Sequence, residues 1–294
     1  MKKIFPILGV IFAVILVVGA ISGATAIVVL HIIKSTPQDT QAAAGASQAA
    51  WKFSPGAPYR IMPVGDSITA GYLDNPKWAQ PFEYGYRSGL LKRLQNANFP
   101  VQFVGSSREP WDGRFGKPTN VPNPDLRTLG QDGCEGYGGW RASGILAKMS
   151  TWLSVNKPDI ILLMIGINDI RGNQGEPIKT EETLSNIVAT VVSQSPNTHL
   201  IVAQITPYSG YSDSLARYNA YIANVLVPYF AGQGKHVTTV NQYTNLCVPG
   251  TTNIDRTAFS NGINHPNNAA YDRMAETWFN GIKALSLGPP QPYH

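Results

Sequence analysis

Five short apolar runs, separated by longer stretches with helical spacing, constrain the fold of this chain most strongly. The runs cover residues 60–64, 101–104, 160–165, 200–205 and 237–240. The other periodic stretches predict helices at 85–96, 142–155, 181–193, 214–230 and 268–285. Strands that alternate with helices form parallel sheets. The sequence therefore predicts a three-layer α/β/α domain around a five-stranded parallel sheet, in the flavodoxin-like strand order 2-1-3-4-5.

An almost wholly apolar segment, residues 4–33, precedes this domain. It exceeds the roughly 20 residues that span a bilayer and the 7 to 15 of a signal-peptide core. Lys2 and Lys3 in front of it favour a cytoplasmic N-terminus and an external catalytic domain. Cleavage after the Ala-Thr-Ala sequence at 24–26 would leave apolar residues 27–33 exposed. We therefore expect an uncleaved signal anchor at 1–34, with secretion after cleavage as the alternative.

The rest of the chain divides into a linker and one domain. Residues 35–52 are rich in Gln, Ala, Ser and Thr without apolar periodicity, which is typical of a flexible linker. Residues 53–294 then form the predicted domain, whose length suits a single α/β unit. A long segment dense in Gly, Pro and Asp, 106–139, is expected to be a functional loop.

Charge and cysteine content exclude several classes of function. The formal net charge is +5, but without Lys2, Lys3 and Lys34 the chain has 20 basic and 18 acidic residues. No basic run with interleaved aromatics remains, so we expect no nucleic-acid partner. The two cysteines, Cys134 and Cys247, make no zinc-type cluster, and we expect no metal. They form either one disulfide outside the cell or two buried thiols.

A serine follows the first apolar run directly. The sequence Gly-Asp-Ser-Ile-Thr at 65–69 places Ser67 past the carboxyl end of a predicted strand, where open α/β sheets bind ligands. Gly65 permits a sharp turn there, and a helix that starts at Ser67 would favour a developing negative charge. A helix N-cap is the alternative role. The Gly-x-Ser-x-Gly elbow is excluded because Thr69 takes its last place.

An asparagine and a histidine are predicted at the same sheet edge. Asn168 follows the third strand in the sequence Gly-Ile-Asn-Asp at 166–169, and the first and third strands are neighbours in the predicted order. His265, in His-Pro-Asn at 265–267, precedes the last helix. An asparagine amide can donate to an oxyanion, and an imidazole can serve as base. A turn asparagine and a structural histidine are the alternatives, but the three residues together favour a nucleophile, an oxyanion donor and a base.

These three sequences, in this order, resemble the blocks of the SGNH/GDSL hydrolase superfamily over residues 59–285. The resemblance implies a serine esterase without a cofactor, whose oxyanion hole contains the N–H of Ser67, a glycine N–H and the Asn168 side chain. The Glu-Gly-Tyr-Gly-Gly-Trp turn at 135–140 supplies that glycine, as Gly139 or, alternatively, Gly138.

More narrowly, residues 60–67, 103–106 and 135–140 look like carbohydrate esterase family 3. That resemblance implies acetylxylan esterase activity, with O-acetylated polysaccharide or a small acyl ester as substrate. The predicted substrate-binding residues are Asp66 and four aromatic residues that either stack on sugar rings or pack in the core: Tyr72, Trp78, Tyr137 and Trp140.

The acid of the catalytic triad departs from the family pattern. The superfamily usually has an Asp three residues before the histidine, a place that Gly262 takes here. In a serine protease, replacement of the triad Asp by Asn lowers turnover about 10⁴-fold. Asn261, Asp255 and a backbone carbonyl compete as the group that orients His265. We favour Asn261 or the backbone.

Two other functions compete with glycan deacetylation. A lipid esterase or lysophospholipase of the same superfamily would share the fold and the catalytic residues and would suit a membrane anchor. The loops at the active edge, however, are rich in Gly, Pro, Asp and aromatics, which predicts no long acyl groove. A non-catalytic glycan-binding protein would not need Ser67, Asn168 and His265 together.

Overall fold

The computed structural model describes residues 57–73, 84–109, 111, 125–171, 177–210, 212–260 and 264–287. In these ranges, no helix combines the length and the apolar character that a membrane span needs. The predicted anchor at 1–34 and the predicted linker at 35–52 both lie outside the described residues.

The sheet has the predicted strand order. Its main strands are parallel and lie in the order β2-β1-β4-β5-β6, which corresponds to 2-1-3-4-5 for the five predicted runs. They are β1 (Tyr59–Gly65), β2 (Val101–Phe103), β4 (Ile160–Met164), β5 (His199–Gln204) and β6 (Val237–Asn241). A two-residue strand that was not predicted, β3 (Glu135–Gly136), pairs with the end of β1.

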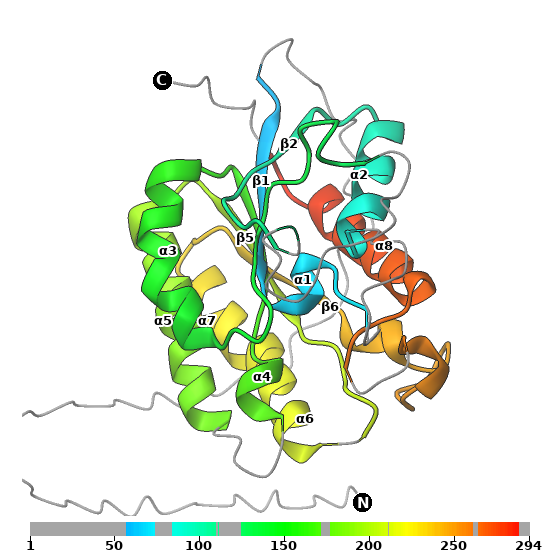
Figure 1. The fold of residues 1–294 in the computed structure, drawn as a ribbon. Helices are drawn as coiled ribbons and strands as arrows, with labels where there is room; N and C mark the ends of the chain where they lie inside the picture. Colours follow the sequence, from blue (N-terminus) through cyan, green and yellow to red (C-terminus); the bar gives the residue numbers. More distant parts are fainter. Residues whose placement is uncertain are drawn as a thin grey trace, which may run out of the picture. The chain divides into compact units, whose positions relative to one another are not determined.

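Helices cover both faces of the sheet. Helices α2 (Tyr86–Asn96) and α8 (Asn268–Lys283) lie together on one face, and α3 (Ala142–Asn156) and α5 (Pro177–Gln194) lie on the other (Figure 1). All five residues of β4 are buried, as expected for a central strand covered on both sides. Two short helices, α1 (Ser67–Ala70) and α4 (Ile167–Ile170), directly follow β1 and β4.

The helix predicted at 214–230 is interrupted. It consists of α6 (Asp213–Tyr221), a π-helical turn η1 (Ile222–Leu226) and α7 (Val227–Ala231). Pro228 lies in the first turn of α7 and has no N–H to donate to the carbonyl four residues earlier. The π-helical turn directly precedes the helical turn that contains this proline. Two 3-10 turns, η2 (Tyr243–Leu246) and η3 (Arg256–Ala258), follow β6.

Both cysteines are buried free thiols, so the disulfide considered from the sequence is wrong and the alternative holds. Cys134 precedes β3, which pairs with β1, whereas Cys247 follows the edge strand β6. β6 lies three strand spacings from β1, or about 14 Å. A disulfide needs Cα atoms less than about 7 Å apart.

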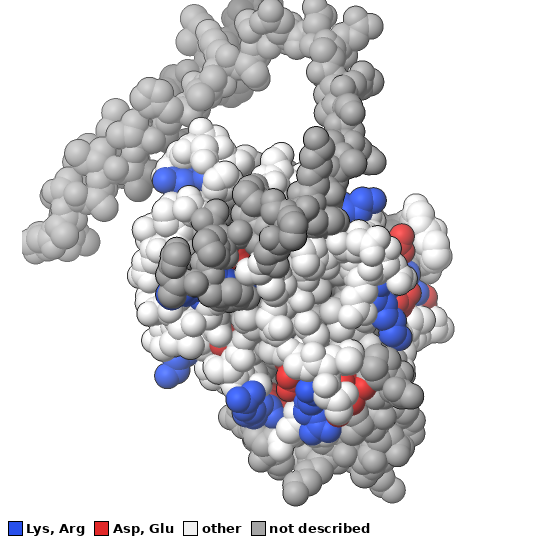
Figure 2. Space-filling view, turned by 90° about the horizontal axis from the view of Figure 1, so that it is seen from above, with Lys and Arg blue, Asp and Glu red and all other residues white. Residues whose placement is uncertain are grey.

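Charged side chains are dispersed on the face that Figure 2 shows. The Lys and Arg residues described there lie singly or beside Asp and Glu, and they form no continuous basic patch on that face. This view gives no support to a nucleic-acid interface there.

Candidate active site

Ser67 begins α1 at the carboxyl end of β1. Asp66 caps this helix, since its carboxylate accepts the N–H of Ile68 at 2.9 Å. A side chain at Gly65 is excluded because a Cβ there would lie 2.3 Å from the carbonyl oxygen of Met164. The Ser67 side chain therefore sits on a tight strand-to-helix turn, only 5% exposed, beside the N–H groups of the helix start.

His265 contacts Ser67 directly. Its Nε2 lies 2.7 Å from Oγ of Ser67, although 198 residues separate the two in sequence. His265 lies in a loop between Phe259 and Pro266, called the histidine loop below. An isolated β-bridge joins these two residues, and the N–H of Ser260 donates to the His265 carbonyl at 3.1 Å. This geometry suits transfer of the serine proton to the imidazole.

Asn168 lies on α4 and contacts the glycine-rich turn. Its Nδ2 donates to the carbonyl oxygen of Trp140 at 2.9 Å. The neighbouring Asp169 accepts the N–H of Ala142 at 3.0 Å and so caps α3, and burial raises the pKa of its carboxyl. Two side chains of one short helix therefore fix the asparagine block to the end of the glycine-rich turn.

Within the turn, the hydrogen bonds favour Gly139 over Gly138 as oxyanion donor. The N–H of Gly138 donates to Oε2 of Glu109 at 2.5 Å and is therefore occupied. Gly139 is exposed and has a φ of +76°, a left-handed conformation that favours glycine. Its N–H is the one of the two that Glu109 leaves available.

A buried carboxylate braces the start of this turn. Glu135 accepts from the backbone and the hydroxyl of Ser106 at 2.8 and 3.1 Å, from the hydroxyl of Tyr137 at 2.8 Å and from Asn156 Nδ2 at 3.1 Å. Burial raises the pKa of Glu135, and these donors partly offset that effect. A carboxylate satisfied so fully specifies one conformation of the turn.

The structure gives Asp66 and Tyr72, two of the predicted substrate-binding residues, contacts within the protein. Each residue is only 2% exposed, and substrate binding by either stays a prediction. Asp66 is a helix cap. Tyr72 instead lies edge-on to His265, with ring centroids 6.2 Å apart.

The other predicted aromatics form a stack or lie outside the described residues. Tyr137 is half-buried and stacks on Trp140 at 4.2 Å between ring centroids and on Trp152 at 5.8 Å. One face of Trp140 is thereby covered, while the residue itself stays partly exposed beside Gly139. Trp78 belongs to the segment that the structure does not describe.

Asp255, one candidate for orienting His265, is engaged elsewhere. Its carboxylate accepts the N–H of Thr257 at 2.9 Å and the Thr257 hydroxyl at 2.6 Å, and it caps the 3-10 turn η3. These bonds lower the pKa of Asp255. Because they commit the carboxylate to its own turn, the structure gives Asp255 a local role. Asn261, the other candidate, lies outside the described residues.

Arg87 supports α1, the helix that begins at Ser67, and sequence reasoning missed it. Its buried guanidinium donates to the carbonyl oxygens of Thr69, Ala70 and Asp132 at 3.1, 3.0 and 2.7 Å. A cation at this end of α1 complements the helix dipole. A signal was present in the sequence, because Arg87 shares its helix face with apolar residues three, four and seven positions later: Leu90, Leu91 and Leu94.

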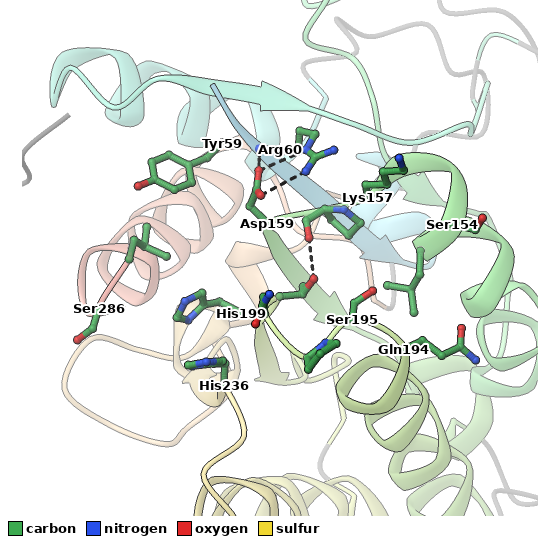
Figure 3. Close-up of a pocket in the computed structure, with 16 residues that line it drawn as sticks. Tyr59, Arg60, Ser154, Lys157, Asp159, Gln194, Ser195, His199, His236 and Ser286 are labelled. Carbon is green, nitrogen blue, oxygen red and sulfur yellow. Dashed lines mark hydrogen bonds and ion pairs between the residues drawn. The ribbon is translucent and has the colours of Figure 1, made fainter. Parts of the chain in front are cut away.

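A hollow of about 580 Å³ lies at the opposite sheet edge, where the strands begin. Figure 3 shows His199 and His236 side by side in it, with the Arg60–Asp159 ion pair on another wall. Among the residues described, no three His, Cys, Asp or Glu side chains are grouped to hold a metal ion, here or elsewhere. Ser67 and His265 contribute nothing to the lining of this hollow.

Comparison with known proteins supports the same chemistry. Residues 64–273 match the GDSL-like lipase/acylhydrolase family. The chain is 29% identical over 258 residues to a multidomain esterase of Ruminococcus flavefaciens, aligning over 79% of its own length but only 30% of that protein's.

Solved structures extend this comparison. A Clostridium thermocellum family 3 carbohydrate esterase is 28% identical, with a TM-score of 0.58 over 77% of this chain and 97% of that one. A carbohydrate esterase family 3 protein of Talaromyces cellulolyticus shares the fold, with 19% identity and a TM-score of 0.54 over 76% of this chain and 96% of that one.

Proposed function

The chain belongs to the GDSL-like lipase/acylhydrolase family, a family of carboxylic ester hydrolases, and we propose that it is a serine esterase with Ser67 as nucleophile and His265 as base. The 2.7 Å contact between His265 Nε2 and Ser67 Oγ carries this proposal. It joins a nucleophile to a base at the carboxyl edge of a parallel sheet, beside N–H groups that can receive an oxyanion.

In the proposed mechanism, His265 takes the proton of Ser67 as Oγ attacks the ester carbonyl carbon. The oxyanion accepts hydrogen bonds from the N–H groups of Ser67 and Gly139 and from the Asn168 amide. His265 then gives its proton to the leaving alkoxide as the ester C–O bond breaks. Water attacks the acyl-enzyme, His265 takes one water proton and passes it to Ser67 Oγ as the acyl C–O bond breaks, and the product leaves as the carboxylic acid, which releases its remaining proton to solvent.

We propose short acyl groups, above all O-acetyl groups on xylan or a related polysaccharide, as the substrate. The family 3 carbohydrate esterase of Clostridium thermocellum, at 28% identity, supports a carbohydrate ester as the substrate. The partly exposed Trp140 next to Gly139 offers an aromatic surface for a sugar ring beside the oxyanion site.

We also propose that residues 1–34 anchor the domain at a membrane, with the catalytic domain outside the cytoplasm. The apolar run at 4–33, preceded by Lys2 and Lys3, supports this proposal. Fractionation of the full chain tests it: the full chain should sediment with membranes in carbonate, and a chain without residues 1–52 should not. Recovery of the full chain in the soluble fraction would contradict the anchor.

The esterase proposal is tested with 4-nitrophenyl esters from acetate to decanoate and with acetylated xylan. Replacement of Ser67 by Ala should lower kcat about a thousandfold or more, because it removes the nucleophile. Ser154→Ala, an exposed serine at the far sheet edge, is the matched control and should retain activity. Equal rates for Ser67→Ala and the wild type would refute the proposal. A preference for decanoate would move the enzyme to the lipid esterases.

A further inference from the structure

Glu109 is a buried carboxylate at the active site that no sequence motif singles out. Its side chain is 4% exposed, and it lies in the Gly- and Pro-rich segment between β2 and β3. A carboxylate this deeply buried is destabilising unless hydrogen bonds compensate for its lost hydration. The groups that compensate for it therefore indicate what the carboxylate holds in place.

One oxygen of Glu109 accepts two hydrogen bonds from different parts of the site. Oε2 accepts the hydroxyl of Tyr72 at 2.7 Å and the N–H of Gly138 at 2.5 Å. The segment itself is tied to β3, because the Glu109 N–H donates to Ser107 Oγ at 3.3 Å and that hydroxyl donates to the Gly136 carbonyl at 2.6 Å. Short bonds to an ionised acceptor are the stronger kind.

Both Tyr72 and Gly138 adjoin a group that takes part in the proposed reaction. Gly138 is bonded to Gly139, whose N–H is the proposed oxyanion donor. Tyr72 lies edge-on to the His265 ring, and its carbonyl accepts the Tyr271 hydroxyl at 2.6 Å, which fixes it to α8. A single oxygen atom of Glu109 thus links the glycine-rich turn to Tyr72, the side chain that lies against His265.

We propose that Glu109 is a positioning residue that fixes the position of the glycine-rich turn relative to His265. By binding the Gly138 N–H, it directs this group away from the substrate and leaves the Gly139 N–H for the oxyanion. By binding Tyr72, it fixes the aromatic edge against which the imidazole lies. Glu109 makes no contact with the reacting atoms in this scheme, and the inference rests on the proposed esterase function.

The kinetic test compares variants that keep or remove the acceptor. Glu109→Ala removes it and should lower kcat on 4-nitrophenyl acetate about 30- to 100-fold with little change in KM, as displacement of a catalytic group does. Glu109→Gln keeps one carbonyl oxygen for both donors and should recover most of this loss. Tyr72→Phe removes one bond and no charge, so it should cost about threefold to tenfold, and it serves if Glu109→Ala does not fold.

The affinity for a boronate inhibitor distinguishes a positioning role of Glu109 from an effect on overall stability. Binding of phenylboronic acid, which forms a tetrahedral adduct with an active serine, should weaken in Glu109→Ala by a factor similar to the loss in kcat. Glu181→Ala is the matched control, since Glu181 is a similarly buried glutamate whose partner is Arg217. It should lower the melting temperature without changing kcat or boronate affinity. A Glu109→Ala enzyme within threefold of the wild type in both kcat and boronate affinity would overturn the proposal.

Amide hydrogen exchange tests the same contact without relying on activity. The Gly138 N–H should be protected in the wild type and in Glu109→Gln and exchange faster in Glu109→Ala, while the amides of β4 stay protected. Unchanged protection of Gly138 in Glu109→Ala would refute the positioning role even in an active esterase. If Glu109→Ala loses this protection and the wild-type protein hydrolyses no ester, the contact is established but the esterase function is refuted.

Discussion

Asp66, between Gly65 and Ser67, has a carboxyl group whose pKa lies near neutrality. Burial raises the pKa of its carboxyl to about 7, while the hydrogen bond from Ile68 and the nearby His265 act in the opposite direction. An unfolded chain would ionise this group near its ordinary pKa of 3.8. The folded protein therefore binds a proton that the unfolded chain releases between those two pH values.

The sign of this difference predicts how Asp66 affects stability. The contribution of Asp66 is fully present below about pH 4 and is lost as the pH rises through about 7. Asp66→Asn keeps the helix cap but cannot ionise, so its free energy of unfolding should rise relative to the wild type from pH 5 to 8. Urea unfolding at several pH values measures this difference.

Asp255→Asn is the control for this measurement. The pKa of Asp255 is lowered rather than raised, so its effect is confined to acid pH and should be constant from pH 5 to 8. An Asp66→Asn difference that is equally constant over that range would show that Asp66 does not carry a raised pKa.

The sequence could identify candidate residues at strand ends but not their burial. Ser67, Asn168 and His265 stand out because the ends of parallel strands meet at one edge, which local pattern alone reveals. The burial of Tyr72 and Asp66 was not predicted, because contacts with residues far along the chain decide exposure. Glu109 has no sequence signal, since Tyr72 and Gly138 are 37 and 29 residues away.

At the scale of elements, α4 and the histidine loop are joined by one side-chain contact. Arg171, directly after α4, donates through Nη1 to Oδ1 of the buried Asn264 at 3.0 Å, and Asn264 precedes His265. The element that carries Asn168 is thereby tied to the loop that carries His265. This contact adds to the β-bridge between Phe259 and Pro266 in holding that loop.

We expect Arg171→Ala to lower kcat about tenfold with KM nearly unchanged, because a small displacement of a catalytic group is costly. Steady-state kinetics on 4-nitrophenyl acetate measures this effect. Arg93→Ala is the matched control: it removes the exposed ion pair with Asp272 that joins α2 to α8 and should leave kcat unchanged. Equal effects of the two variants would show that the Arg171 contact has no role in catalysis.

The elements differ in how well the sequence predicts them. Strands such as β4 are predictable because every residue is apolar, and the alternation with helices predicts that the strands are parallel. The break at Ile222–Leu226 was not predicted, although Pro228 is its visible cause, because apolar periodicity continues through it. The two-residue strand β3 is too short to have a pattern of its own.

At the scale of the whole molecule, the carboxyl ends and the amino ends of the parallel strands, called the carboxyl edge and the amino edge, carry different groups. The carboxyl edge carries Ser67, Asn168 and the glycine turn, with buried carboxylates that fix their geometry. The amino edge carries the hollow in which the rings of His199 and His236 lie 4.6 Å apart between centroids. β5 begins at His199, so its buried residues lie between this hollow and the carboxyl ends of the strands.

This separation predicts a pH effect on stability without an effect on catalysis. Burial, and secondarily His236, lowers the pKa of His199 below its ordinary 6.5. A histidine with a lowered folded pKa contributes stability above its unfolded pKa and loses it as the pH falls, because the unfolded chain then binds the proton more readily. His199→Asn should therefore lose less stability than the wild type between pH 7.5 and 5.5. Its kcat on 4-nitrophenyl acetate at pH 7.5 should equal that of the wild type.

Thermal unfolding at a series of pH values, paired with kinetics on the same samples, distinguishes the possible outcomes. Parallel pH dependence in His199→Asn and the wild type would mean that this imidazole is not the group responsible. A fall in kcat with unchanged stability would mean that the two edges are coupled. Under the proposed division, protonation at the amino edge changes the free energy of unfolding but not how Ser67 reacts, because the fully buried, closely packed strand β4 lies between β5 and β1.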